Sequence, residues 1–330
     1  MLEPIDSFET KSVLITGGAG FIGSSLAIRL VEAGARVTVV DSLVPEYGGN
    51  LYNLRPVDGR VTVNVSDVRD EHSLAHLIGE TDLIFNLAGQ TSHLDSMHDP
   101  FTDLEINCVS QLHILETCRR INPEAMVVFA STRQLYGRPE YLPVDERHPL
   151  HPVDVNGVNK LAGEQYHLLY NEVYGIPTCA LRLTNTYGPR MRVKDARQTF
   201  LGIWVRMVVE DQPFEVWDGG QLRDFTYVDD AVDALLRCAS DPAAIGQVFN
   251  LGGLEAVDLT ELAGRLVAVA GTGSFERHVY PEERKKIDIG DYYADFTKIS
   301  DAVGWQPTVS LEDGLALTVA YYRDHLEAYR

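Results

Sequence analysis

A run of glycines near the N-terminus is the strongest chemical signal in this sequence of 330 residues. Gly17, Gly20 and Gly23 follow a short apolar segment, Val13–Thr16, and open a stretch whose apolar residues have helical spacing. The first glycine allows a tight turn, the second lets a pyrophosphate approach the backbone, and the third lets helix and strand pack closely. The helix N-terminus, with its free N–H groups, then faces the phosphates. The pattern predicts a dinucleotide-binding loop.

An acidic residue stands at the end of the next apolar segment. Asp41 follows Val37–Val40 and comes 18 residues after Gly23. A carboxylate at this place can accept both hydroxyls of an adenosine ribose and repels a 2′-phosphate. The sequence therefore predicts NAD, in preference to NADP, as the cofactor.

The elements that must position this loop alternate between strand and helix patterns. Strands are expected at Val13–Thr16, Val37–Val40, Val61–Val65, Leu83–Leu87, Met126–Phe129 and Thr178–Leu183, and helices at 20–33, 70–78, 103–121 and 154–174. This alternation predicts an α/β fold of the Rossmann type, with a doubly wound parallel sheet. We expect residues 1–183 to form the NAD-binding domain, with 225–252 returning to it. Residues 184–330, where short helices and strands mix, are expected to form a smaller C-terminal substrate domain.

The composition excludes several classes of partner. Asp and Glu total 48 against 28 Lys and Arg, and a net charge of −20 argues against binding to nucleic acid or to an anionic membrane. The four cysteines form no CxxC pair, which favours buried reduced thiols over disulfides or a metal site. His72, His76 and His98 lack metal-ligand spacing, so no metal is expected. No apolar run approaches membrane-spanning length, and a cytoplasmic protein is expected.

Several motifs in a fixed order resemble those of the extended short-chain dehydrogenase/reductases that epimerise or dehydrate nucleotide sugars. They are the loop from Thr16 to Gly23, Ser66–Asp70, Asn86–Gln90, Asn107, Leu181–Pro189 and Arg223–Asp230. The family commonly has His where Asn86 stands. The resemblance implies a Rossmann fold, bound NAD and a nucleotide-diphosphate sugar as substrate. It also implies a homodimer, because the helices at 103–121 and 154–174 match those that pair in relatives.

The resemblance also assigns binding residues. Cofactor contacts are expected from Gly17, Gly20, Phe21, Ile22, Gly23, Asp41, Asp67, Val68, Leu87, Ala88, Gln90, Asn107 and Lys160. Substrate contacts are expected from Asn185 and Arg223 at the phosphates, Arg284 and Lys285 at the diphosphate, Asp288 at the nucleoside ribose, Trp217 at the base, and Arg197 and Gln198 in the same pocket.

The catalytic residues of the family are only partly present. In relatives a Ser or Thr, a Tyr and a Lys carry the redox step, and Thr132 and Lys160 match the first and the last. The slot of the Tyr, four residues before Lys160 and on the same helix face, holds Asn156. The acidic pair that dehydratases carry after the Thr is replaced by Arg133 and Gln134, which are poor general acids or bases.

Three interpretations of Asn156 stay open. Hydride chemistry persists with another base, such as Lys160, Tyr136, His93 or water; Asn156 holds a substrate hydroxyl in a different reaction; or the protein binds NAD and a nucleotide sugar without efficient turnover. We expect an NAD-dependent epimerase that works through a transient keto-sugar. The alternatives are a dehydratase or lyase with an atypical base, and a non-catalytic binding protein.

The reacting carbon also stays open. Carbon 4 is the commonest in the family. Two stretches resemble the 2-epimerases of CDP-linked dideoxyhexoses, and they favour carbon 2. They are Ala88–Gln90 with Ser96 and Asn107, and Arg197-Gln198 with Trp204.

Overall fold

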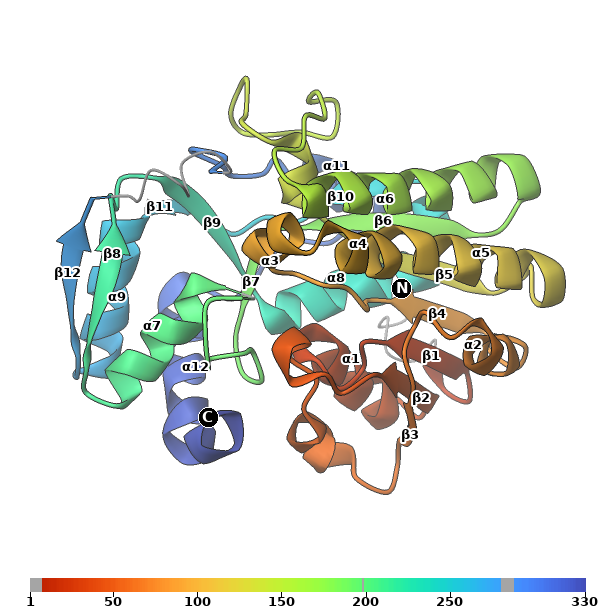
Figure 1. Ribbon diagram of the computed structural model, residues 1–330, viewed down its shortest axis with the longest axis horizontal. Coiled ribbons are helices and arrows are strands. Elements are labelled where there is room, and N and C mark those ends of the chain that lie inside the picture. Colours follow the sequence, from red (N-terminus) through yellow and green to blue (C-terminus); the bar gives the residue numbers. More distant parts are fainter. Residues whose placement is uncertain (1–7, 198, 280–287) are drawn as a thin grey trace.

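A seven-stranded parallel sheet forms the centre of the computed structural model, which describes residues 8–197, 199–279 and 288–330 (Figure 1). The strand order is β10-β6-β5-β4-β1-β2-β3. The strands are β1 (Ser12–Thr16), β2 (Arg36–Asp41), β3 (Thr62–Val65), β4 (Leu83–Asn86), β5 (Met126–Thr132), β6 (Thr178–Leu183) and β10 (Val248–Asn250). The α/β fold with a doubly wound parallel sheet is thereby confirmed.

Helices cover both faces of this sheet. Successive residues of each buried strand point to opposite sides, so each strand contributes apolar side chains to two cores, one under each helical layer. Val13 and Ile15 of β1 belong to the core beneath α1 (Phe21–Glu32) and α8 (Val228–Ser240), whereas Leu14 belongs to the other core. That second core lies beneath three helices: α2 (Glu71–Ile78), α5 (Ser110–Ile121) and α6 (Val155–Tyr174). The near-continuous apolar character of the strands follows from this two-sided burial.

A buried ion pair joins α6 to the sheet. Arg182 on β6 and Glu164 on α6 approach to 2.5 Å, and Ser131 at the end of β5 donates to the same carboxylate at 2.6 Å. Gly175 ends α6 in the left-handed conformation, with φ of 73°, which glycine adopts without strain. The contacts of Glu164 hold the middle of α6 against the C-terminal ends of β5 and β6.

The expected helix at 103–121 is divided in the structure. It consists of α4 (Pro100–Leu104), a π-helical turn over Glu105–Val109 and α5. The carbonyl of Ile106, which falls in this turn, accepts from the side chains of both Ser110 and Gln111. Such single π turns inside longer helices are frequent at functional sites, and this one carries Asn107.

The remaining strands form two small sheets, and most of them lie on the left in Figure 1 with α7 (Phe200–Val209) and α9 (Leu259–Ala270), whereas α11 (Thr297–Val303) lies beside β10 of the large sheet. The strands are β7 (Asn185–Tyr187), β8 (Pro213–Trp217), β9 (Leu222–Tyr227), β11 (Ala256–Asp258) and β12 (Ser274–His278). Strand β9 lies between β7 and β11, and β8 pairs with β12. Helix α12 covers Leu311–His325, and the short α3 (His93–His98) follows β4.

The cysteines agree with the sequence prediction, since all four are buried and carry free thiols. Within the described ranges, no helix combines the length and the apolar character needed to cross a bilayer.

Candidate active site

A cavity opens at the carboxyl edge of the large sheet, where ligands bind in open α/β folds. It brings together most of the residues predicted for the cofactor and the catalytic step: Gly17, Gly20, Phe21, Ile22, Gly23, Asp41, Asp67, Val68, Leu87, Ala88, Gln90, Thr132, Asn156 and Lys160. Asn107 is not among the residues that line the cavity, and it is fully buried. We call this space the cofactor cavity.

The glycine loop has the geometry that a phosphate site requires. Gly17 takes a φ of +69°, and a Cβ on Gly23 would lie only 2.3 Å from the carbonyl oxygen of Gly17. Helix α1 starts after Gly20 with no capping side chain from the described residues and no acidic residue in its first turn. Its first N–H groups therefore remain open to an anion, and the loop fits the pyrophosphate of a dinucleotide.

Asp41 closes the other side of this loop. Its Oδ2 accepts from the N–H of Ala19 at 3.0 Å and its Oδ1 from the N–H of Leu43 at 2.9 Å. Burial raises the pKa of Asp41, and these backbone hydrogen bonds oppose that rise. The carboxylate is thus held at the end of β2, beside the cavity, where an adenosine ribose is expected.

Lys160 enters the same cavity from α6. Its Nζ donates to the carbonyl oxygen of Ala130 at 3.1 Å and lies 5.0 Å from the centre of the Phe129 ring. Burial lowers the pKa of Lys160 to about 8, and the negative charge of Asp103 partly offsets the fall. The amine is therefore mostly protonated at pH 7, and it serves better as a fixed cation than as a base.

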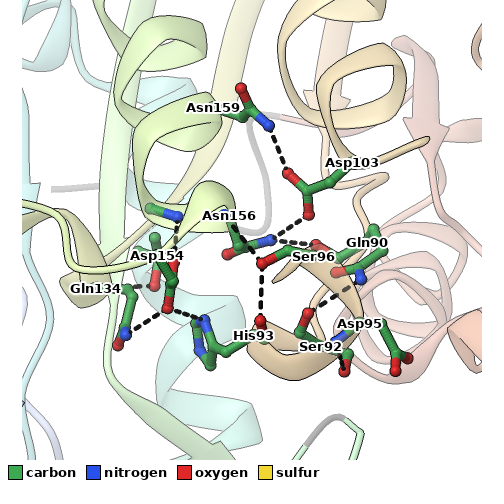
Figure 2. A network of polar contacts seen from close by, with 12 residues as sticks. Gln90, Ser92, His93, Asp95, Ser96, Asp103, Gln134, Asp154, Asn156 and Asn159 are labelled. Atoms are coloured by element: carbon green, nitrogen blue, oxygen red, sulfur yellow. Dashed lines mark hydrogen bonds and ion pairs between the residues drawn. The ribbon is translucent and has the colours of Figure 1, made fainter. Parts of the chain in front are cut away.

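Asn156 belongs to a buried network of hydrogen bonds (Figure 2). Its Nδ2 donates to the carbonyl oxygen of Gln90 at 2.7 Å and to Oδ2 of Asp103 at 3.0 Å. Asp103, which has no exposed surface, also accepts from the amides of Asn107 at 3.0 Å and Asn159 at 2.8 Å. Both amide hydrogens of Asn156 are used in these bonds, so only its Oδ1 is left for a ligand.

A second cavity of about 650 Å³ adjoins the first, and we call it the substrate cavity. Among the predicted substrate residues, it is lined by Asn185, Arg197, Trp217, Arg223 and Asp288. Gln198, Arg284 and Lys285 lie outside the described residues. Five residues line both cavities: His93, Arg133, Gln134, Asn185 and Thr199. These five mark the junction of the cavities.

The predicted substrate residues already have protein partners. Arg223 donates to the carbonyl oxygens of Leu222 and Gly290, and its Nη2 lies 3.4 Å from Asp288. The indole N–H of Trp217 donates to Glu215 at 3.1 Å. Arg223 and Asp288 are therefore held together as one polar wall of the substrate cavity.

Arg133 is a junction residue to which sequence reasoning gave no binding role. Its Nη2 donates to Oδ1 of Asn185 at 2.8 Å, and its guanidinium lies 5.4 Å from the centre of the Tyr292 ring. Burial lowers its pKa, although an arginine stays charged. Its Nη1 is buried and has no hydrogen-bond partner among the described residues. In the sequence, its place directly after Thr132 was the one feature that could have indicated a binding role for Arg133.

Besides Lys160, two side chains were suggested as replacement bases, Tyr136 and His93, and their surroundings differ. Tyr136 is wrong for this role, because it is fully buried and its hydroxyl bonds to Asn250 at 2.7 Å and Arg182 at 2.6 Å. Burial also raises the pKa of Tyr136 to about 12. His93, in contrast, lies at the junction of the cavities, with Nδ1 3.0 Å from Oδ2 of Asp154.

Comparison with known proteins supports a family assignment for this site. The family model described as GDP-mannose 4,6 dehydratase matches residues 14–318. A UDP-glucose 4-epimerase of Mycolicibacterium smegmatis is 32% identical over 314 residues, which cover 94% of this chain and 98% of that protein.

Solved structures give the same result. An epimerase from the methanogen Methanothermobacter thermautotrophicus superposes with a TM-score of 0.92 and 25% identity, covering 100% of this chain and 97% of that one. A dTDP-glucose 4,6-dehydratase of Streptomyces venezuelae, solved with NAD, superposes with a TM-score of 0.85 and 28% identity, covering 96% and 98%. Epimerases and dehydratases thus share this architecture.

Proposed function

Because this chain belongs to the GDP-mannose 4,6-dehydratase family of extended short-chain dehydrogenase/reductases, we propose that it is an NAD-dependent nucleotide-sugar epimerase. The reaction would pass through a transient keto-sugar at carbon 4 or carbon 2. Residues 1–183 would hold the cofactor, with 225–252 returning to that domain, and residues 184–330 would hold the nucleotide sugar.

The junction of the two cavities is the observation that carries this proposal. The five shared residues join the substrate cavity to the cofactor cavity, which Thr132 and Lys160 line. A sugar bound in the substrate cavity would therefore lie next to these two residues. NAD, when bound, takes up a hydride from a sugar carbon and returns it. The glycine loop would hold its pyrophosphate and Asp41 its adenosine ribose, whereas Lys160 would bind the nicotinamide ribose and Thr132 would hold the reacting oxygen.

Two junction residues favour epimerisation over dehydration. A dehydratase needs a group that protonates the departing hydroxyl and a group that removes the neighbouring proton. At the predicted place of these groups, Arg133 is a permanent cation, and the amide of Gln134 donates to Asp154 at 2.8 Å. Neither side chain titrates near neutral pH. Dehydration remains the second candidate, because solved dehydratases share the fold.

The test is incubation of the NAD-loaded protein with a panel of UDP-, CDP-, GDP- and dTDP-sugars, followed by NMR in deuterated water. Epimerisation without deuterium in the product supports direct return of the hydride. Deuterium at a neighbouring carbon indicates enolisation or elimination and would contradict the proposal. Tight binding without turnover of any panel member would instead indicate a non-catalytic nucleotide-sugar sensor.

Replacing Gly23 by alanine is expected to weaken NAD binding by at least about tenfold and to lower the free energy of unfolding by about 1–3 kcal/mol. The new Cβ would lie 2.3 Å from the oxygen of Gly17 and 2.9 Å from Cα of Gly18, both backbone atoms that cannot move freely. Calorimetric titration with NAD and urea unfolding measure the two effects. The matched control is Gly264→Ala in α9, where no described atom lies within 4 Å of the added Cβ. Unchanged NAD affinity of Gly23→Ala would contradict the prediction.

We also propose a homodimer that pairs through α5 and α6. Apolar side chains are exposed along these helices and the preceding α4, among them Phe101, Val109, Val158, Leu169 and Val173. Exposed apolar side chains, when they gather in one patch, mark protein contacts. A monomer in sedimentation velocity at micromolar concentration would contradict this arrangement.

A further inference from the structure

His93 and Asp154 form a pair at the junction of the two cavities (Figure 2). Nδ1 of His93 lies 3.0 Å from Oδ2 of Asp154. The carboxylate has no exposed side-chain surface, whereas the side chain of His93 is 39% exposed. One side of the imidazole is thus held against a buried acid, and the residue contributes to the walls of both cavities.

Asp154 is fixed by bonds that do not involve His93. Its Oδ1 caps α6 by accepting from the N–H of Gly157 at 2.7 Å, and its Oδ2 accepts from Nε2 of Gln134 at 2.8 Å. Burial alone would raise the pKa of Asp154, but its bonds to His93, Gly157 and Gln134 hold that pKa below its usual range. Asp154 is therefore ionised at neutral pH and can only accept hydrogen bonds.

An ionised carboxylate determines the tautomer of its histidine partner. Nδ1 of His93 is buried 3.0 Å from Oδ2 of Asp154, which is within ion-pair distance but lacks the alignment of a hydrogen bond. The negative charge of Asp154 favours the neutral tautomer that carries its hydrogen on Nδ1, which leaves Nε2 unprotonated. Among the described residues, no group forms a hydrogen bond with Nε2. A base oriented by a carboxylate in this way is the arrangement that activates hydroxyl groups in many enzymes.

We propose that His93 is the general base and acid of this enzyme, with Asp154 as its positioning residue; this inference rests on the proposed epimerase function. The O–H bond of the reacting sugar hydroxyl breaks, and an N–H bond forms on Nε2. The O–H electron pair forms the carbonyl, and the C–H bond breaks with loss of a hydride, which NAD would accept when bound. The reverse step returns the proton from Nε2 to the oxygen of the new epimer.

The other candidate side chains considered for the proton transfer do not compete for this role. Lys160 is mostly protonated at pH 7 because its pKa is about 8, and Tyr136 is buried away from both cavities. Asn156 has an amide that does not titrate. Thr132 is suited to hold the sugar oxygen but cannot store its proton.

Further charged groups belong to the cavities that His93 lines. Arg133 and Arg197 line the same cavity, and Arg197 pairs with Asp95 of α3 at 3.4 Å. Of these groups, Asp154 lies in contact with the imidazole, at 3.0 Å from Nδ1.

The first experiment measures the tautomer of His93 by ¹⁵N NMR of the imidazole rings in the full-length protein without substrate. The His93 signals are assigned with His93→Gln. We expect protonated Nδ1 and unprotonated Nε2 in the wild type. Asp154→Asn should move the hydrogen to Nε2, because the asparagine N–H₂ would face Nδ1 while its oxygen still caps α6. A wild-type ring that carries its hydrogen on Nε2 would overturn the proposal.

The second experiment measures turnover with the NAD-loaded protein and UDP-, CDP-, GDP- and dTDP-sugars. His93→Gln is expected to lower turnover by about 10²–10⁴-fold, and added imidazole should restore part of it in His93→Gly. His98→Gln is the matched control, because His98 is exposed on the same helix and lines neither cavity. Equal turnover of His93→Gln and His98→Gln would overturn the proposal.

The two experiments separate this inference from the proposed function. A wild-type protein that turns over no member of the panel would contradict the epimerase function, and with it the catalytic role of His93. The tautomer measurement then still determines whether Asp154 holds an unprotonated Nε2 at the junction. Turnover by the wild type together with full activity of His93→Gln would leave the epimerase function standing and remove only His93.

Discussion

Replacing Lys160 by methionine is expected to lower turnover by about 10²–10³-fold while the protein remains folded. The ammonium group is the buried cation of the cofactor cavity, held at 3.1 Å from the carbonyl oxygen of Ala130. Methionine fills a similar volume but can neither donate a hydrogen bond nor stabilise developing negative charge. Turnover with the nucleotide-sugar panel and the affinity for NAD by calorimetry measure this loss.

The same substitution is expected to stabilise the protein without ligand at pH 7. Burial lowers the pKa of Lys160 from 10.5 to about 8, so the folded protein disfavours the charged amine. Each pKa unit corresponds to about 1.4 kcal/mol, and after the lost contacts we expect a gain of about 1–3 kcal/mol. Urea unfolding of both proteins measures it.

The pH dependence of this gain has a definite sign. Between pH 8 and 10.5 the unfolded chain binds more protons at Lys160 than the folded protein does. The free energy of unfolding of the wild type therefore rises with pH relative to that of Lys160→Met. The difference between the two proteins should narrow across this interval. A difference that widens would show that the amine is not destabilised by burial.

A second lysine provides a matched control. Lys298 donates to the carbonyl oxygen of Val248 at 2.8 Å and lies 5.2 Å from the centre of the Phe249 ring, much as Lys160 lies beside Ala130 and Phe129. Lys298 lines neither cavity. Lys298→Met should keep turnover within about threefold of the wild type. Equal losses in both variants would show that turnover depends on packing and not on the cation of the cavity.

Replacing Asp103 by alanine is expected to lower the free energy of unfolding by about 3–5 kcal/mol. The carboxylate has no exposed surface and accepts from Asn107, Asn156 and Asn159. Its loss removes the acceptor of three buried amides and the counter-charge of Lys160. Urea unfolding at pH 7 measures the change.

The variant Asp103→Asn separates packing from charge. Asparagine has nearly the same shape, but it offers one acceptor oxygen and turns an N–H₂ group toward other amides. The pKa of Lys160 should fall below about 8, because the negative charge that raises it is gone. The control is Glu105→Ala, an exposed carboxylate paired with Arg69, where a change below about 1 kcal/mol is expected. An equal loss in Asp103→Ala and Glu105→Ala would contradict the importance of the buried network.

The sequence by itself determined the fold and the position of the cofactor loop. Both depend on local signals: strand and helix periodicities set the parallel sheet, and the spacing of Gly17, Gly20 and Gly23 sets the turn before α1. Thr132, Asn156 and Lys160 were predicted from motif register, and the structure places all three in one cavity. The sequence did not predict the π turn at Glu105–Val109, which interrupts the single helix expected at 103–121.

Only the tertiary structure decided how the polar groups pair, because those contacts join residues far apart in the chain. Asn156 meets Asp103 across 53 positions, and Tyr136 meets Asn250 across 114. In the first contact, the amide of Asn156 donates to a buried carboxylate. In the second, the hydroxyl of Tyr136 donates to Asn250 and is not available to a substrate. His93 and Asp154 meet because α3 packs against α6 at the sheet edge. Burial and proximity are properties of the folded chain. Motif register therefore predicts Asn156 in the place of the usual Tyr, whereas the contact between His93 and Asp154 is found only in the structure.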